Sequence, residues 1–305
     1  MAAKKSTNGR SLAFAVLERA APAVGAKLLD RIWFRLPPVS EKTRRLRVEL
    51  PAATRFEIPF GTGTLRGGSY GDGPTIYLVH GWGGWGLQLA AYIPPLVASG
   101  FRVVAYDGPS HGDSSPGPEG AGRSTLPELA DAFQAVVAAQ GPAYGVIAHS
   151  LGAAAISLAL KAGFTATKVV FLATATDFRP TLDLFQANLG FGPRTRERFL
   201  RHFARKFGPM ESFVMSSVIE ELAGRLELPE LLVIHDRGDP ETPYEGSMRL
   251  AEVWPGGRIE LTEGLGHNRV LWDQGVVESA RSFLVESEER APRGDAGTVQ
   301  ETMQG

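Results

Sequence analysis

The stretch YGVIAHSLGAA, residues 144–154, decides the fold of this 305-residue chain. An apolar run ends at His149, a serine follows, and a run of small residues typical of a helix begins. A sharp turn from strand to helix around a serine requires small side chains two positions before and after it, which Ala148 and Gly152 provide. The pattern predicts that Ser150 ends a strand with its hydroxyl exposed. A serine that only caps a helix gives a similar local pattern, so the surrounding sequence must decide between the two interpretations.

Strand and helix patterns alternate on both sides of this turn. We expect strands at 75–79, 101–106, 144–149, 168–173, 230–235 and 257–262, and helices at 87–98, 125–140, 151–162, 244–253 and 275–286. The second, third and fourth of these strands are almost continuous apolar runs, as in a parallel sheet covered by helices on both faces. The fold class is therefore predicted to be α/β, with a doubly wound, mostly parallel sheet.

The rest of the chain is divided by its patterns into further segments. We expect an N-terminal helical segment with an edge strand at 1–50, an α/β core at 51–177 and 229–288, a helical cap insertion at 178–228 and a disordered tail at 289–305. Short, partly alternating runs at 45–50 and 55–60 predict two edge strands. The cap is predicted because no strand pattern interrupts its helical patterns.

The N-terminal segment lacks the pattern of a signal peptide or of a membrane span. Its apolar stretch covers only residues 11–17 before charged residues interrupt it, which is too short for either. We therefore expect a surface helix and a cytoplasmic protein. The alternative is an interfacial helix with weak membrane or lipid contact, in keeping with Lys27, Arg31 and Arg35.

Composition excludes several classes of function. The net charge is −1, which argues against a nucleic acid bound through bulk charge. Cysteine is absent, which excludes disulfides, cysteine nucleophiles and thiolate metal sites. Apolar residues make up 43% of the chain, enough for a sizeable core. The sequence requires neither a cofactor nor a metal, and it does not indicate the oligomeric state.

A glycine-rich loop, VHGWGGWG at 79–86, allows two functional interpretations. Gly81, Gly83 and Gly86 follow a predicted strand, and Asp107 comes about twenty residues later, which is the pattern of a dinucleotide-binding turn. The same residues also form the His-Gly-x-Gly sequence of a loop that supplies an oxyanion-hole N–H in serine hydrolases. On the second interpretation, the glycines bend the loop so that the N–H of Trp82 faces Ser150.

A serine nucleophile needs a histidine base and an acid that orients it. His267 lies in the loop GLGH after the last predicted strand, where such a base is needed. Asp239 is the preferred acid because it follows the preceding strand and precedes a predicted helix, and Asp236 is the alternative, with a turn-capping role as its ordinary explanation. The order along the chain is serine, aspartate, histidine.

These motifs resemble those of the α/β-hydrolase fold family from about residue 54 to residue 286. The resemblance rests on HGWGG at 80–84, DGPSHGDS at 107–114, AHSLGA at 148–153, HDRGDPETP at 235–243 and GLGH at 264–267. It implies that Ser150 is the nucleophile, Asp239 the acid and His267 the base, with the N–H groups of Trp82 and Leu151 as the oxyanion hole. One departure is Ala148, where the family has glycine, and a small residue suffices there.

The hydrolase interpretation accounts for every motif, whereas the dinucleotide interpretation leaves the serine turn and the GLGH loop unexplained. We expect a carboxylesterase that forms an acyl-enzyme with a small, uncharged and moderately hydrophobic ester. The predicted substrate-binding residues are Gly81, Gly83, Trp85 and His149. A thioesterase, an amidase or a carbon–carbon bond hydrolase would use the same residues, and a haloperoxidase, a lyase or a binding module could share the fold. The arginine-rich run at 194–205 is expected to be a solvated helix face rather than a site for acidic groups.

Overall fold

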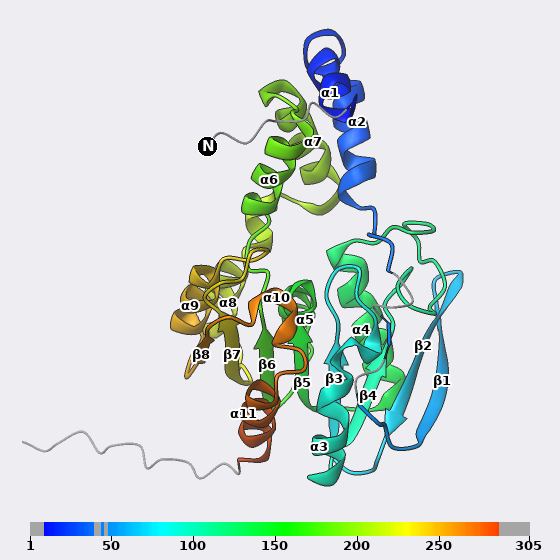
Figure 1. Cartoon of the computed structure of the whole chain (residues 1–305), viewed down its shortest axis with the longest axis vertical. Coiled ribbons are helices and arrows are strands. Elements are labelled where there is room, and N and C mark those ends of the chain that lie inside the picture. The colour runs from blue at the N-terminus through cyan, green and yellow to red at the C-terminus, as the bar shows by residue number, and fades with distance from the viewer. Residues whose placement is uncertain (1–8, 40–43, 46–47, 287–305) are drawn as a thin grey trace, which may run out of the picture.

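The computed structural model describes residues 9–39, 44–45 and 48–286. Its centre is one eight-stranded sheet in the order β1-β2-β4-β3-β5-β6-β7-β8 (Figure 1). The strands are β1 (Ala53–Phe60), β2 (Gly63–Tyr70), β3 (Thr75–Val79), β4 (Arg102–Tyr106), β5 (Ala143–His149), β6 (Lys168–Leu172), β7 (Glu230–Asp236) and β8 (Arg258–Thr262). β1 and β2 run antiparallel to their neighbours, while β4, β3, β5, β6, β7 and β8 are mutually parallel. The predicted fold class is therefore confirmed.

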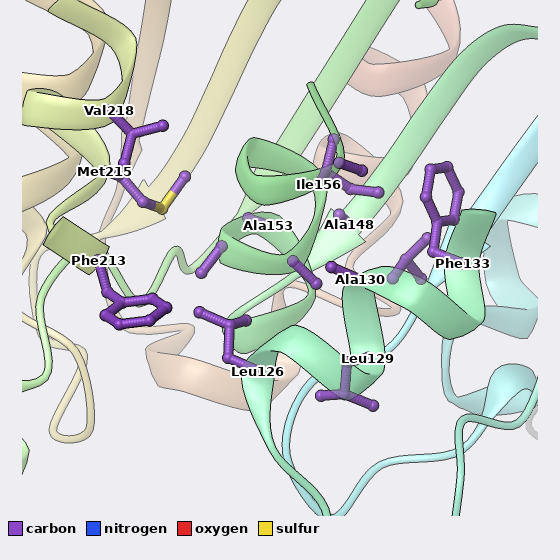
Figure 2. Packing of buried hydrophobic residues seen from close by; sticks show 14 of the residues in the cluster. Leu126, Leu129, Ala130, Phe133, Ala148, Ala153, Ile156, Phe213, Met215 and Val218 are labelled. Carbon is purple, nitrogen blue, oxygen red and sulfur yellow. The ribbon is translucent and has the colours of Figure 1, made fainter. Parts of the chain in front are cut away.

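Helices cover both faces of the sheet, because each inner strand is apolar on both sides. The helical elements are α1 (Gly9–Ala20), α2 (Pro22–Trp33), η1 (Gly86–Tyr92), α3 (Ile93–Ala98), α4 (Leu126–Gln140), α5 (Leu151–Lys161), α6 (Arg179–Leu189), α7 (Pro193–Phe207), η2 (Met210–Phe213), α8 (Met215–Ala223), α9 (Tyr244–Val253), α10 (Gly266–Arg269) and α11 (Gln274–Val285). In β3, Ile76 and Leu78 join the apolar cluster of η1, α3 and α11, whereas Tyr77 and Val79 join that of α4, α5, α8 and α9. Figure 2 shows the second cluster, in which Phe133 of α4 and Ile156 of α5 lie close to the sheet.

The N-terminal helices and two helices of the segment 178–228 pack together into a helical lobe, defined here as α1, α2, α6 and α7. The lobe projects from one end of the molecule, away from most of the sheet (Figure 1). Trp33 of α2 lies 5.1 Å from the ring of Phe185 and 5.7 Å from the ring of Phe199. Glu18 of α1 accepts hydrogen bonds from the N–H groups of Arg194 and Thr195 at the start of α7. Two segments far apart in sequence therefore form one packed unit.

Two local predictions differ from the structure, and one strand was not predicted. The strand expected at 45–50 is wrong for its described residues, because β1 takes the edge position and pairs with β2 over its whole length. Leu46 and Arg47 lie outside the described residues, as does the tail predicted at 289–305. The helix expected at 87–98 is a 3-10 helix followed by a short α-helix. β2 was not anticipated, because its glycines weaken the strand pattern.

The described part of the N-terminal segment contains two helices, and the helical run breaks between them at Ala21. Leu12 and Val16 of α1 are exposed. The weak membrane or lipid contact suggested for this segment stays a prediction. Among the described residues, no helix combines the length and the apolar character needed to cross a membrane.

Candidate active site

The serine turn joins β5 to α5 in a strained backbone conformation. Ser150 has φ 51° and ψ −119°, which a residue with a side chain rarely adopts. Its N–H donates to the carbonyl of Leu172 on β6, which fixes the turn to the sheet. A Cβ on Gly152 would lie 2.8 Å from the carbonyl oxygen of Val79 and 2.7 Å from that of His80, so only glycine fits there. This serine turn, called the elbow below, is therefore held in place by contacts on both sides.

The structure brings Asp239 and His267 into direct contact. The Oδ2 atom of Asp239 lies 2.8 Å from Nδ1 of His267, which follows β8 at the start of α10. Asp236, the alternative acid, is used elsewhere: its carboxylate accepts hydrogen bonds from Gly238 N–H, Thr262 Oγ1 and Leu265 N–H. Asp236 thus holds the loop that carries the histidine, and Asp239 contacts the histidine itself.

The carboxylate of Asp239 is fully buried and surrounded by donors. Thr242 donates to it from both its N–H and its hydroxyl, and Nε2 of His235 lies 3.2 Å from Oδ2. Burial alone would raise the pKa of Asp239, but hydrogen bonds from His235 and His267 lower it well below its ordinary value. Asp239 therefore stays ionised throughout the physiological pH range.

His235 and Thr242 were not predicted as site residues. The Nε2 atom of His235 lies near Asp239 and the carbonyl of Thr242, and its Nδ1 lies 2.7 Å from Ser247 Oγ, so both ring nitrogens have partners. The spacing of four residues between His235 and Asp239, across the turn after β7, is the only sequence signal of this contact.

Ser150 and His267 both line the carboxyl edge of the sheet, and their side chains are nearly buried. Among the described residues, Ser150 Oγ has no hydrogen-bond partner, so a serine–histidine hydrogen bond is not formed in this structure. The link between the two loops is His149, whose Nε2 lies 3.0 Å from the carbonyl oxygen of His267. The nearest carboxylate to Nε2 of His267 belongs to Glu241, at 3.7 Å.

The glycine loop lies directly beside the elbow. A Cβ on Gly81 would lie 3.0 Å from Cβ of Ser150, which places the two segments in contact. The backbone N–H groups of Trp82 and Leu151 have no acceptor among the described residues. Two free donors next to one serine are what a developing oxyanion needs.

The same loop does not have the geometry of a dinucleotide site. Asp107 accepts hydrogen bonds from the N–H groups of Gly86 and Asp113, so its carboxylate fixes the loop instead of facing a ribose. Pro37 occupies the space in front of Gly83, where a pyrophosphate would have to approach. A 3-10 helix follows the loop, so the N-terminus of an α-helix is missing there as well.

The predicted substrate-binding residues differ in their accessibility. Trp85 is partly exposed, and Trp82 packs edge-on against His111 at 5.9 Å. Gly83 uses its N–H to donate to Nε2 of His111. His149 is buried beneath the site, so the structure gives it a supporting position rather than a surface that a substrate can touch.

Three buried histidines lie next to the site in the neutral form. Burial lowers the pKa of His80 to about 4 and the pKa values of His111 and His149 to about 3. His80 accepts a hydrogen bond from the N–H of Gly108, and this requires an unprotonated Nε2. The neutral rings therefore act as hydrogen-bonding supports for the loops around Ser150.

Comparison with known proteins agrees with this fold. An esterase from Thermogutta terrifontis, solved with malate bound, superposes with a TM-score of 0.57 at 18% identity, over 76% of this chain and 98% of that one. A bromoperoxidase from Bacillus anthracis superposes with a TM-score of 0.58 at 17% identity, over 77% and 99% of the two chains. These identities show a common fold only.

Sequence comparison is more specific. A serine hydrolase-like protein from Danio rerio is 34% identical over 103 residues, which make up 33% of this chain and 31% of that protein. The match therefore spans less than a third of that relative's length. The model of the alpha/beta hydrolase family matches residues 76–280, which is more than half of this chain. The chain belongs to the alpha/beta hydrolase family.

Proposed function

We propose that the protein is a serine hydrolase that cleaves carboxylic esters through an acyl-enzyme. The observation that carries this proposal is the contact of 2.8 Å between Asp239 and Nδ1 of His267, beside a strained Ser150 with a free hydroxyl. The esterase among the structural neighbours supports the reaction class, although its identity of 18% shows the fold alone. Ester hydrolysis is the simplest reaction that such a set of groups performs.

In the proposed reaction, Ser150 Oγ attacks the ester carbonyl carbon while Nε2 of His267 takes the hydroxyl proton. The negative charge on the carbonyl oxygen is stabilised by the N–H groups of Trp82 and Leu151. His267 then gives its proton to the leaving alkoxide as the carbon–oxygen bond breaks. Water repeats the sequence on the acyl-enzyme and releases the carboxylic acid.

Asp239 supports the base in this scheme by accepting the Nδ1 proton of His267. The imidazole thereby presents an unprotonated Nε2 to the serine, and the positive charge that it gains is balanced by the carboxylate. In this scheme the serine–histidine hydrogen bond forms when substrate binds, because catalytic hydrogen bonds are often long or poorly aligned without substrate.

An uncharged reacting group fits the charges near the proposed base. The carboxylate of Glu241 lies 3.7 Å from Nε2 of His267 and would repel an anionic group close to the scissile bond. We therefore expect neutral acyl groups to be preferred over acyl groups with a carboxylate near the carbonyl.

The test is hydrolysis of p-nitrophenyl esters from acetate to palmitate by the wild type and by Ser150→Ala. The variant should lose on the order of a millionfold in turnover. Ser157→Ala is a matched control, because Ser157 is also buried on α5 but donates only to the carbonyl of Ala153. Equal activity of Ser150→Ala and the wild type would reject Ser150 as the nucleophile.

A second measurement separates the nucleophile from the choice of substrate. A fluorophosphonate transfers its phosphonyl group to an activated serine hydroxyl with loss of fluoride, whatever the natural substrate is. We expect labelling of the wild type at Ser150 and none of His267→Gln. Labelling without ester hydrolysis would keep the nucleophile and direct the screen to thioesters, amides and carbon–carbon bonds.

A further inference from the structure

One cleft among the described residues is not lined by Ser150 or His267. It has a volume of about 950 Å³ and lies between the end of α2, the glycine loop and the loop at 110–123. This volume is in the range of sites for small organic ligands. The cleft and the site around Ser150 proposed for the acyl group (the acyl site) contact different residues of the glycine loop: Gly83 and Gly84 line the cleft, whereas Gly81 contacts the turn at Ser150.

The cleft is strongly basic. Among the described residues, four arginines contribute to its lining, Arg31, Arg35, Arg44 and Arg123, against one carboxylate, that of Asp30. His111 also lines the cleft, but burial lowers its pKa to about 3, so it adds no charge at neutral pH. Several guanidinium groups around one cavity repel each other unless an anion joins them.

Two of the four arginines are held in place by protein contacts. Arg123 donates to the carbonyl of Arg31, lies 3.6 Å from Asp30 and packs over the ring of Phe34 at 5.9 Å. Arg44 pairs with Asp113 at 3.2 Å. A fixed guanidinium presents its planar set of donors without a large loss of side-chain entropy, which favours recognition of carboxylate or phosphate.

The other two arginines are unpaired among the described residues. Arg31 lies in the last turn of α2 and Arg35 just beyond it, and neither contacts a carboxylate of the described chain. The end of the helix favours a cation by at most about 1 kcal/mol. That effect does not explain why both side chains line the same cleft as Arg44 and Arg123.

The lining residues between Arg35 and Arg44 are apolar, in contrast to the arginines. Leu36, Pro37, Pro38 and Val39 also line the cleft and give it an apolar wall. We propose that the cleft binds a small amphiphilic anion: a phosphate or carboxylate that contacts the arginines, attached to a short hydrocarbon chain that packs on this wall. This site is distinct from the proposed acyl site and does not depend on the proposed reaction.

Occupation of the cleft would act on the glycine loop. Gly83 donates its N–H to His111, and the residue before it, Trp82, packs against the ring of His111. A ligand that contacts Gly83, Gly84 and His111 would restrict the segment that carries the free N–H of Trp82. The natural ligand is thus expected to alter the activity of the enzyme as well as its stability.

Calorimetric titration at low ionic strength with hexyl phosphate, hexanoate and hexan-1-ol tests the proposal. At least one of the two anions should bind, and the neutral alcohol should bind at least about tenfold more weakly. The double variant Arg31→Gln/Arg35→Gln should weaken binding of the anion about tenfold or more. The matched control is Arg194→Gln/Arg198→Gln, which removes two exposed arginines of α7 outside the cleft and should leave binding within about twofold.

The other possible results of the titration either identify the head group or overturn the proposal. Binding of only one anion identifies the head group as phosphate or carboxylate. Absence of binding by both anions, or equal binding by the folded Arg31→Gln/Arg35→Gln variant, would overturn the proposal. The titration is repeated with Ser150→Ala, which should bind the anion like the wild type. Loss of binding in that variant would place the anion in the acyl site instead, and it would also reject the proposal.

Discussion

The carboxyl edge of the sheet and the helical lobe are built by different kinds of contact. At the edge, carboxylates accept hydrogen bonds from nearby backbone N–H groups: the partly buried Asp107 from Gly86 and Asp113, and the buried Asp236 from Gly238 and Leu265. In the lobe, aromatic rings from distant segments pack against each other, as Trp33 does with Phe199. The edge therefore has directional contacts that fix atoms, whereas the lobe has apolar contacts that fix only the arrangement of helices.

This difference predicts how each region responds to a substitution. A hydrogen-bonded carboxylate at the edge has a geometric role that an isosteric substitution can remove without changing the volume of the side chain. A ring in the lobe contributes through the area that it buries, and its loss affects stability first. The substitutions below compare the two regions directly.

The largest expected effect is on activity at the edge. Asp239→Asn should lower kcat about ten-thousandfold, because the amide favours the wrong tautomer of His267. Asp236→Asn is the matched comparison: its carboxylate supports the loop of Thr262 and Leu265 and does not touch the base. Steady-state kinetics with denaturation curves should therefore show an activity defect in the first variant and mainly a stability defect in the second. The reverse pattern would identify Asp236 as the acid.

Acid should destabilise the edge strongly. His80, His111 and His149 have folded pKa values of about 4, 3 and 3, below the ordinary 6.5, so the unfolded chain binds more protons in this range. Stability should be intact above pH 6.5 and fall with increasing slope as the pH decreases toward 4, with a contribution on the order of 1 kcal/mol per pH unit from each histidine. The raised pKa values of Asp107 and Glu128, caused mainly by burial, oppose this slope in part.

One variant measures how much His149 contributes to this pH dependence of stability. His149→Gln keeps a donor for the carbonyl of His267 but has no group that titrates. In urea unfolding measured at several pH values, its slope should be about a third smaller than that of the wild type. An unchanged slope would show that His149 is protonated in the folded state.

In the lobe, Phe199→Ala should cost about 3 kcal/mol of stability, because the ring is fully buried against Trp33 and Phe203. Hydrogen exchange should show faster opening of α2, α6 and α7, with β5 and β6 unchanged. Phe133→Ala, at an equally buried ring between Tyr77 and Phe164, should instead weaken the sheet. The same pattern in both variants would mean that lobe and sheet unfold as one unit.

The smallest effect is expected at the junction of α1 and α7. Glu18→Ala removes the acceptor for the N–H groups of Arg194 and Thr195 and should cost about 1 kcal/mol. Arg19→Ala, at the next residue, is exposed and serves as the control, with an expected change within about 0.5 kcal/mol. Thermal unfolding of the two variants, each compared with the wild type, measures the difference.

The contrast between the sheet edge and the lobe also explains which features of the structure the sequence predicts. The strands of the parallel sheet and the elbow were anticipated, because apolar runs, Gly152 and the position of Ser150 are local signals. The contact between Asp239 and His267 followed from chain order and from resemblance to a family. The roles of these residues remain predictions until the variants are measured.

Other contacts had no local signal. The packing of Trp33 against Phe185 and Phe199 depends on helices that are separated by most of the core, and no pattern in either segment names its partner. The same holds for His235, whose ring could be placed against Asp239 only after the turn between them was known. The strand expected at 45–50 failed because alternation does not tell which of two neighbouring runs takes the sheet edge.

The junction of Glu18 with the start of α7 has a consequence for synthesis of the chain. The two partners are 176 residues apart, so at ordinary translation rates α1 and α2 leave the ribosome on the order of ten seconds before α7 exists. During this interval Phe34, which is buried in the finished protein, lacks the rings of Phe203 and Phe207 on α7 that later pack against it. The nascent N-terminal segment is therefore the part of this protein that we expect a chaperone to bind.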